Sequence, residues 1–223
     1  MFSVIIPMAG SGNRTGLSVN KAFYKINNKP LFMYAYEMFM QFDCEIILVC
    51  KDGEEKYAKK FAPDATIVLG GRTRAESVFR GLLACNFDKV IIHDAARPFL
   101  TKDMILNTLN ALDNNKCAYV GINSRDTIRN NKQEILNRDD IIIVQTPQAG
   151  YRSDFLKAFE LGKSDSLTDD ISYLQKYLAY KPVVIPGSSL NFKVTTPDDI
   201  VLANAIKRGE DIWELDMHGI LID

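Results

Sequence analysis

Residues 4–16, VIIPMAGSGNRTG, decide how the rest of the chain is interpreted. A run of β-branched and other apolar residues ends at Pro7 and gives way to a loop that holds three glycines and an arginine. Glycine lets backbone N–H groups approach a ligand closely, and a loop that follows a strand is a common place for a phosphate group. The stretch therefore predicts a strand that leads into an anion-binding loop.

The loop matches neither of two common phosphate-binding patterns. A Walker A loop needs a lysine and a hydroxyl residue after its last glycine, and residues 10–16 offer neither in place. The dinucleotide pattern G-x-G-x-x-G meets Thr15 where its third glycine should stand, which disfavours a nicotinamide-dependent oxidoreductase. Two interpretations remain: a polyphosphate cradle flanked by the cations of Arg14 and Lys21, or a tight β-to-α turn with two solvated charges.

Up to about residue 120, short apolar runs alternate with longer amphipathic stretches. The runs are apolar at consecutive positions, which is typical of a parallel sheet that helices cover on both faces. The expected strands are residues 2–7, 44–50, 65–69 and 89–94, and the expected helices are residues 30–42, 54–61, 75–86 and 102–112. We therefore predict an α/β fold of three layers with a largely parallel sheet.

Residues 121–144 interrupt this alternation. They contain short extended pieces between polar clusters, SRDTIRNNKQEILNRDD, and no helical stripe wide enough to cover a sheet. We expect a β-arm that protrudes from the main body, and a loosely packed surface hairpin with solvated charges is the alternative.

The α/β alternation resumes after the arm. We expect helices near residues 152–161 and 169–177, a strand at 182–186, an extended segment at 191–194 and a last helix from residue 196. No internal repeat divides the chain. We therefore predict one domain over residues 1–223, with a dimerisation arm at 121–144 and a C-terminal tail at 209–223.

Composition and charge exclude several classes of protein. The 27 Lys and Arg residues against 28 Asp and Glu leave a formal charge of -1, so no global field attracts nucleic acid or an anionic membrane. No apolar stretch approaches the roughly 20 residues of a membrane span, and no targeting segment is evident, which predicts a cytoplasmic protein. The four cysteines lack a C-x-x-C spacing, so we expect no zinc site, no disulfide framework and no metal-ligand cluster.

Four further stretches place polar side chains at the ends of expected strands. They are GGRTRAESV at 70–78, HDAARP at 93–98, QTPQ at 145–148 and NFKVTTPDD at 191–199. Ligands of open α/β sheets bind at the carboxyl ends of the strands. We therefore predict that basic and hydroxyl side chains gather at one edge of the sheet.

The motifs AGSGNR, KAF, GGRTRAESV, HDAARPF, RDTIR, QTPQ, TDD and NFKVTTPDD follow one another in this order. These motifs and their order resemble those of the cytidylyltransferases of the non-mevalonate isoprenoid pathway. The resemblance extends from residue 2 to about residue 207. The resemblance implies a Rossmann-like nucleotidyltransferase that transfers CMP from CTP to 2-C-methyl-D-erythritol 4-phosphate. A ribitol 5-phosphate cytidylyltransferase and a noncatalytic nucleotide-sensing module are the alternatives, and HDAARP and TDD favour the isoprenoid enzyme over the ribitol enzyme.

The resemblance also implies roles for individual residues. The catalytic cations would be Arg14, Lys21 and Lys193. The groups that bind CTP would be Met8, Ala9, Gly10, Ser11, Gly12, Gly71, Ser77 and Asp94. The polyol phosphate would be bound by Asp94, Arg97, Thr127, Arg138, Thr146 and Lys193. The implied cofactor is Mg²⁺ held mainly through the CTP phosphates, and the implied assembly is a homodimer joined by the arm.

Two positions depart from the family pattern. Asn20 precedes Lys21 where proline is usual, and Thr15 follows Arg14 where a bulky apolar residue is usual. Both departures concern the stiffness of the loop rather than its charge.

Polar residues beside the motifs are assigned structural roles. His93 ends an apolar strand, and the phosphate acceptor needs no general base because its second pKa is about 6. Thr168 is expected to cap a helix whose first turn carries Asp169 and Asp170.

Overall fold

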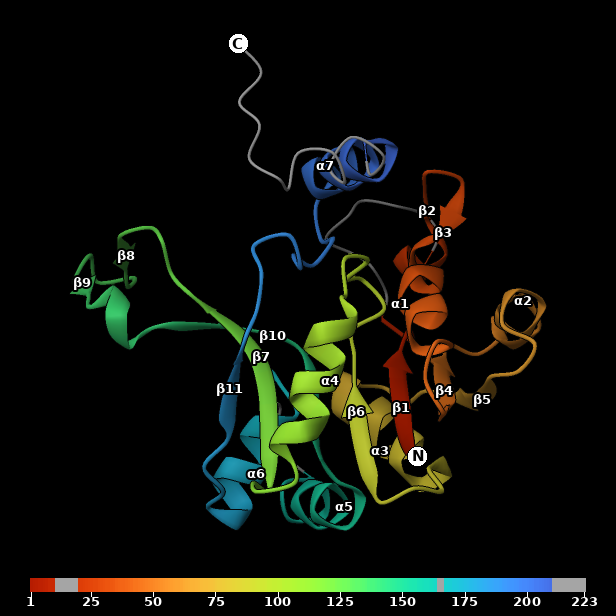
Figure 1. Ribbon diagram of the computed structural model, residues 1–223, viewed down its shortest axis with the longest axis horizontal. Coiled ribbons are helices and arrows are strands. Elements are labelled where there is room, and N and C mark those ends of the chain that lie inside the picture. The colour runs from red at the N-terminus through yellow and green to blue at the C-terminus, as the bar shows by residue number, and fades with distance from the viewer. Residues whose placement is uncertain (11–19, 164–166, 210–223) are drawn as a thin grey trace.

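The computed structural model describes residues 1–10, 20–163 and 167–209. Its centre is a seven-stranded sheet in the order β11-β7-β10-β6-β1-β4-β5 (Figure 1). The strands are β1 (Phe2–Pro7), β4 (Cys44–Cys50), β5 (Thr66–Leu69), β6 (Lys89–Ile92), β7 (Cys117–Asn123), β10 (Ile142–Tyr151) and β11 (Val183–Pro186). β10 pairs antiparallel with both β6 and β7, whereas the other neighbouring strands pair parallel. The predicted sheet is thus confirmed as mostly parallel, with one reversed strand.

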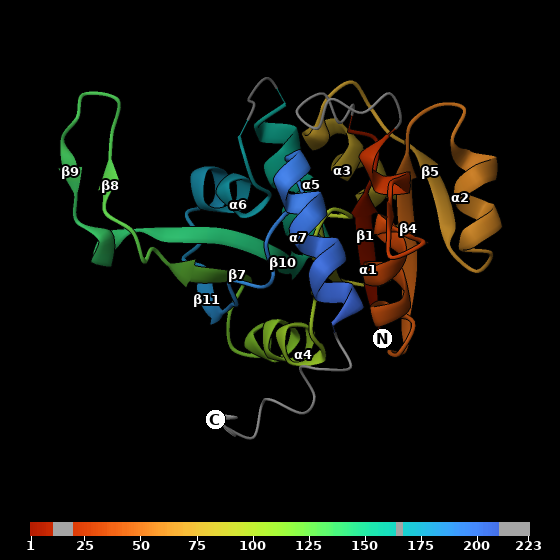
Figure 2. The ribbon, with the colours of Figure 1, turned by 90° about the horizontal axis from the view of Figure 1, so that it is seen from above.

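Helices cover both faces of this sheet. They are α1 (Leu31–Phe39), α2 (Glu55–Phe61), α3 (Arg74–Ala84), α4 (Lys102–Ala111), α5 (Arg152–Leu161), α6 (Ile171–Leu178) and α7 (Pro197–Arg208). On β1, Val4 and Ile6 pack with α1, α2 and α4, whereas Ile5 packs with α3, α5 and α6. Figure 2 shows α4 separated by the sheet from α3, α5 and α6. This explains why the apolar runs are continuous: both faces of the central strands are buried.

A third apolar cluster joins α7 to the start of the chain's first helix. Val194 and Ile200 pack there with Leu31 and with Ile26 of the small sheet formed by β2 (Lys25–Ile26) and β3 (Lys29–Pro30). The cluster fixes α7 beside the carboxyl edge of the main sheet. The segment 191–194, expected to be extended, is not a strand, although the Val194 N–H donates to the Ala96 carbonyl at 2.8 Å.

Between β7 and β10 the chain forms a hairpin that lies apart from the layers (Figures 1 and 2). It contains β8 (Ile128–Arg129), β9 (Ile135–Leu136) and a 3-10 turn, η3 (Arg138–Asp140). The outer part of β10 pairs with the end of β7, so the hairpin is joined to the body by two strands of the main sheet. None of the helices in the described ranges combines the length and the apolar character that a bilayer crossing requires.

Candidate active site

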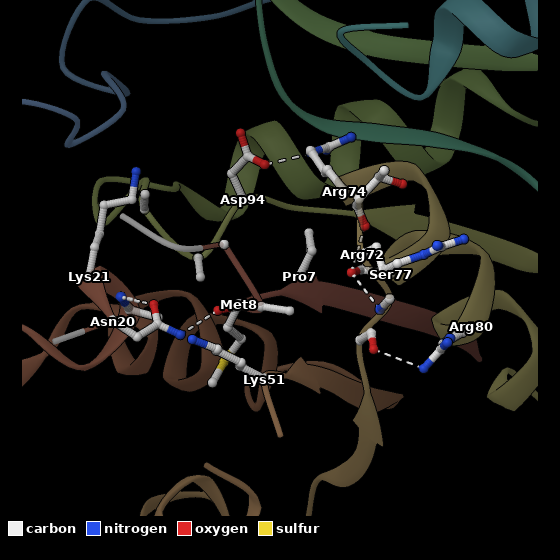
Figure 3. A pocket seen from close by; sticks show the side chains of 18 of the residues that line it. Pro7, Met8, Asn20, Lys21, Lys51, Arg72, Arg74, Ser77, Arg80 and Asp94 are labelled. Carbon is white, nitrogen blue, oxygen red and sulfur yellow. Dashed lines mark hydrogen bonds and ion pairs between the residues drawn. The ribbon is translucent and has the colours of Figure 1, made fainter. Parts of the chain in front are cut away.

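A cavity of about 760 Å³ opens where β1, β4, β5 and β6 end (Figure 3). Its size lies in the usual range for small-molecule sites, about 300–1,000 Å³. The predicted residues that line it are Met8, Ala9, Gly10, Lys21, Gly71, Ser77, Asp94 and Lys193. Ser11, Gly12 and Arg14 lie outside the described residues, and Arg97, Thr127, Arg138 and Thr146 do not line this cavity. Three of the four stretches expected at strand ends, 70–78, 93–98 and 191–199, thus contribute to the cavity. The expectation for QTPQ is wrong, because residues 145–148 lie within the antiparallel strand β10 and do not line the cavity.

The segment expected to bind phosphates begins where β1 ends. We call its described residues, Met8, Ala9 and Gly10, the cradle. The Met8 N–H donates to the Val49 carbonyl at 2.8 Å, which continues the pairing of β1 with β4 by one residue. Gly10 follows, and a Cβ built there meets no atom of residues 1–10, 20–163 and 167–209 within 4 Å. Among these residues, no side chain lies between the backbone of Gly10 and the cavity.

Residues 70–73, which we call the GG turn, form the opposite wall. The Gly70 N–H donates to the Cys50 carbonyl at 2.7 Å, and a Cβ at Gly70 would lie 2.5 Å from the Cβ of Ala9. Glycine is thus required here, because the turn approaches the cradle too closely for any side chain.

Ser77 fixes the shape of the GG turn. Its hydroxyl accepts the Gly71 N–H at 3.0 Å and donates to the Thr73 carbonyl at 2.8 Å. The Thr73 side chain in turn accepts the Glu76 N–H and caps α3. The contact of Ser77 with the cytosine base stays a prediction. In the structure, the two hydrogen bonds of its hydroxyl group hold the GG turn in shape.

Asp94 lies directly after β6 among three cations. Its Oδ2 accepts from Lys193 Nζ at 2.7 Å and lies 3.9 Å from Arg97 Nε, and its Oδ1 accepts from Arg74 Nη2 at 3.3 Å. Burial alone would raise the pKa of Asp94, but the charges of Arg74, Lys193 and Arg97 outweigh it and the pKa is lowered. Asp94 is therefore ionised and holds Lys193 at the cavity wall.

Arg74 and Asp170 form a pair that the motifs alone did not suggest. Two guanidinium nitrogens of Arg74 bond the two oxygens of Asp170, each at 2.7 Å, and Asp170 is fully buried. The same guanidinium group reaches Asp94, so α3, α6 and β6 meet in one chain of charges. In the sequence this pair could be recognised only from the second arginine of GGRTRAESV and the second aspartate of TDD. The two residues are 96 positions apart, so no local pattern connects them.

The predicted cap of α6 by Thr168 is wrong. The helix starts at Ile171, and the N–H groups of Asp170 and Ile171 donate to Gln148 Oε1 at 2.9 and 3.2 Å. Asp169 accepts the Ser172 N–H at 3.0 Å. A side chain from the neighbouring strand β10 thus satisfies the helix end, because Asp170 itself is turned toward Arg74.

His93 is a buried structural residue, as the sequence predicts. Its Nδ1 pairs with the Thr146 hydroxyl at 3.0 Å and its Nε2 with the Arg97 carbonyl at 3.3 Å. A carbonyl only accepts, so Nε2 carries the proton and Nδ1 accepts from Thr146. Burial lowers the pKa of His93 to about 4, which keeps the ring neutral.

Thr146 and Arg97 brace the floor below Asp94. The Thr146 hydroxyl accepts the Asp94 N–H at 3.2 Å, and Arg97 donates to the carbonyls of Asn191 at 2.7 Å and Val144 at 3.4 Å. These bonds tie the segment that carries Lys193 to β10 and β6. Their predicted contacts with a polyol phosphate stay predictions.

The two predicted residues on the hairpin are exposed. Thr127 precedes β8, and Arg138 opens η3, where its guanidinium group lies 3.5 Å from the Arg125 carbonyl. Neither lines the cavity of its own chain.

The part of the chain that the structure describes offers no ready metal cage. Within the described ranges, no three His, Cys, Asp or Glu side chains come together as a potential metal site. Asp94 and Asp52 line the cavity, and both oxygens of Asp94 are engaged by cations.

Comparison with known proteins agrees with this geometry. The family model of 2-C-methyl-D-erythritol 4-phosphate cytidylyltransferase matches residues 2–209. An enzyme of that name from Clostridium botulinum is 37% identical over 223 residues, covering 92% of this chain and 96% of the relative. One from Halalkalibacterium halodurans is 34% identical, with coverage of 92% and 96%.

Solved structures give the same result. The crystal structure of 4-diphosphocytidyl-2C-methyl-D-erythritol synthase from Anaerococcus prevotii is similar with a TM-score of 0.80 at 31% identity, over 93% of this chain and 98% of that one. The 2-C-methyl-D-erythritol 4-phosphate cytidylyltransferase from Thermus thermophilus has a TM-score of 0.80 at 28% identity, over 92% and 98%. Sequence and fold therefore agree over nearly the full length of the relatives, and the chain belongs to the 2-C-methyl-D-erythritol 4-phosphate cytidylyltransferase family.

Proposed function

We propose that this protein transfers CMP from CTP to 2-C-methyl-D-erythritol 4-phosphate and releases pyrophosphate. The observation that carries the proposal is one cavity in which the end of β1, the GG turn, Lys21 and Lys193 face a common space. An anionic substrate pair fits a wall of this composition, because the fixed cations of Lys21 and Lys193 stabilise phosphate charge.

The reaction needs alignment rather than a protein nucleophile. An oxygen of the acceptor phosphate attacks the α-phosphorus of CTP and forms a new P–O bond. The bond from the α-phosphorus to the bridging oxygen breaks, and pyrophosphate leaves with that electron pair. Lys21 and Lys193 neutralise the charge that grows on the α-phosphoryl oxygens, and Arg14 joins them.

The two ends of the cavity suit the two ends of the nucleotide. The GG turn presents backbone groups in a fixed shape, which suits the edge of a cytosine ring. The end of β1, with Met8, Ala9 and Gly10 in the cavity wall, suits the triphosphate. Asp94 can accept hydrogen bonds from sugar hydroxyls, and its ionised state makes that acceptance independent of pH near neutrality.

We propose Mg²⁺ as the cofactor, held mainly by phosphate oxygens of CTP. Mg²⁺ prefers oxygen ligands and keeps several waters, so it needs few protein groups. Asp52 is the carboxylate at hand in the cavity, because both oxygens of Asp94 are bonded by Arg74 and Lys193. The ion would supply further neutralisation of the triphosphate, while this chain's own cations act at the α-phosphorus.

We propose that the protein is a homodimer joined by the arm, residues 121–144. The apolar side chains of Ile135, Ile142, Ile143 and Val144 are exposed along this segment, which favours burial against a second subunit. Thr127 and Arg138 would then reach the partner's cavity, where they would bind the acceptor phosphate.

A cytoplasmic location fits the four cysteines, which are all free thiols.

The test supplies CTP and Mg²⁺ with either 2-C-methyl-D-erythritol 4-phosphate or ribitol 5-phosphate, and follows the release of pyrophosphate. We expect release with the first acceptor and little with the second. Faster release with ribitol 5-phosphate would support the ribitol enzyme. Binding of CTP without release under either condition would support a sensing module.

A further inference from the structure

Asn20 uses both ends of its side-chain amide at the rim of the cavity (Figure 3). Its Nδ2 donates to the Met8 carbonyl at 2.6 Å and to Glu54 Oε2 at 2.8 Å. Its Oδ1 accepts the Ala22 N–H at 3.0 Å. The bond to Met8 is short for an N–H···O bond, the other two have ordinary lengths, and the bond to the Glu54 carboxylate is charge-assisted. The amide is therefore held in a single orientation.

The bond to Met8 joins the two sides of the loop that carries Arg14. Met8 and Asn20 stand 12 positions apart in the sequence. Met8 belongs to the sheet, because its N–H donates to the Val49 carbonyl at 2.8 Å. Asn20 is thereby anchored to the end of β1, and a short tether of this kind reduces the freedom of the residues next to it.

Glu54 extends the connection to a third segment of the cavity wall. The oxygen that accepts from Asn20 also accepts the Lys51 N–H at 3.2 Å, and the Glu54 N–H donates to the Lys51 carbonyl at 3.1 Å. Lys51 lines the cavity in the turn after β4. One carboxylate thus holds the β4–α2 turn and the start of the Lys21 segment together.

Lys21 follows Asn20 directly and opens a short 3-10 turn, η2 (Lys21–Phe23), whose N-cap is Asn20. The Asn20 carbonyl accepts the Phe23 N–H at 3.0 Å, so both the backbone and the side chain of Asn20 shape this turn. The direction in which Lys21 leaves the backbone therefore depends on where Asn20 is held.

We propose that Asn20 is a positioning residue for cytidylyl transfer. Together with Glu54 it forms a strap that holds the backbone of Lys21 against Met8, so that the Lys21 ammonium group is in place before the α-phosphorus arrives. Preorganised charge of this kind acts on the transition state more than on substrate binding. The proposal rests on the proposed function, since the reaction is its readout.

Asn20→Asp is the sharpest single change. The carboxylate can still accept the Ala22 N–H, but it has no donor for the Met8 carbonyl and it faces the Glu54 carboxylate. The strap should open while the size of the side chain is kept. We expect kcat to fall about 10-fold to 100-fold, with a smaller change in the KM for CTP.

A second substitution should restore part of the strap. In the double variant, Asn20→Asp with Glu54→Gln, the carboxylate at position 20 no longer faces a like charge, and the new amide can donate to it, although the bond from the Lys51 N–H to position 54 is then lost. We expect this double variant to recover at least about threefold in kcat over Asn20→Asp. Glu54→Gln alone keeps an acceptor for Asn20, and its kcat is the baseline against which the double variant is compared.

Asn115→Asp is the matched control. Asn115 is also partly buried and donates its Nδ2 to a backbone carbonyl, that of Ala111 at 2.9 Å, but it lies at the end of α4 away from the cavity. Its kcat should be unchanged. Unfolding midpoints of all variants show whether each protein is folded.

The outcomes separate the strap from the function itself. If the unmodified protein releases no pyrophosphate, the proposed function fails. If it does and Asn20→Asp keeps its kcat, or changes only the KM for CTP, the strap is refuted. Equal kcat losses in Asn20→Asp and the double variant, in proportion to lowered unfolding midpoints, would also refute it, because Asn20 would then act on stability alone.

Discussion

Both carboxylate oxygens of Asp170 are bonded by the guanidinium group of Arg74, each at 2.7 Å, in a site that excludes water from the aspartate. Removing Asp170 takes two charge-assisted bonds out of this buried site and leaves Arg74 with its longer bond to Asp94, at 3.3 Å. We expect Asp170→Ala to lower the free energy of unfolding by about 3 kcal/mol, measured by chemical denaturation.

The exposed pair Lys89–Asp113, at 2.6 Å, is the control for this prediction. Its partners are largely solvated, so Asp113→Ala should cost less than about 1 kcal/mol. Similar losses in the two variants would show that the Arg74–Asp170 pair has no special weight.

His93 makes the stability depend on pH. Burial lowers its pKa from 6.5 to about 4, so between these values the unfolded chain binds a proton that the folded protein does not. The contribution of neutral His93 to the free energy of unfolding is therefore fully present above about pH 6.5. It is lost as the pH falls toward about 4, and the loss amounts to about 3 kcal/mol.

Denaturation curves at several pH values test this, with His93→Gln for comparison. The variant should be less stable near neutral pH and should lose less stability on acidification. The lowered pKa of Asp94 acts only at still lower pH, below the ordinary range for a carboxyl group, so it does not overlap with this window. An equal slope in both proteins would contradict the prediction.

Lys193→Ala should abolish most of the turnover without unfolding the protein. The side chain donates to Asp94 at 2.7 Å, and Asp94 retains Arg74 and Arg97 when it is lost. We expect kcat to fall about 100-fold or more, as for other lost electrostatic groups. Lys21→Ala should lower kcat to a similar extent. Lys60 is exposed on α2, and Lys60→Ala should leave kcat unchanged. Wild-type rates in either cavity variant would remove these lysines from the mechanism.

Gly70→Ala should loosen the wall of the cavity. The new methyl group would lie 2.5 Å from the Cβ of Ala9 and 3.2 Å from the Cys50 carbonyl oxygen, so the turn must move. We expect a loss of about 1–3 kcal/mol in stability and a higher KM for CTP. The methyl group of Gly10→Ala meets no atom of the described residues within 4 Å and should leave the unfolding midpoint unchanged, which calorimetry can check.

The arm can be tested by mixing two inactive variants. If Arg138 serves the partner's cavity, a dimer of one Arg138→Ala subunit and one Lys193→Ala subunit has one intact site. Random exchange of subunits should then restore about a quarter of the activity. No recovery in a mixture shown by mass to contain the mixed dimer would mean that the arm serves its own chain.

Much of the fold could be predicted because the central strands are buried on both faces. Val4, Ile5 and Ile6 pack into opposite layers, so their run of apolar residues indicates a strand between helices. The direction of β10 could not be predicted, since the apolar pattern of a strand does not depend on which way it runs. The GG turn and HDAARP were placed correctly because strand ends of an α/β sheet share an edge.

The contacts that organise the site were harder to predict. Arg74 and Asp170 are 96 positions apart, and Asn20 and Glu54 are 34 apart, so no local pattern connects them. Thr168 looked like a helix cap by local preference, but Gln148 from β10 takes that place. Such partners are chosen by the tertiary arrangement and not by neighbours in the sequence.

The reversed direction of β10 has a consequence for how the protein can vary in length. Its early residues pair with β7 toward the arm, and a few residues later Thr146 supports Asp94 from the same strand. The pairing of β10 with β7 keeps one register from Ile142 to Val144 and shifts before Gln148, so Thr146 lies in the irregular part of the strand. A residue inserted between Ile142 and Thr146 would displace the threonine hydroxyl from the Asp94 N–H. Insertions and deletions in related chains should therefore fall at the hairpin tip between β8 and β9, where the spacing of the strand is not disturbed.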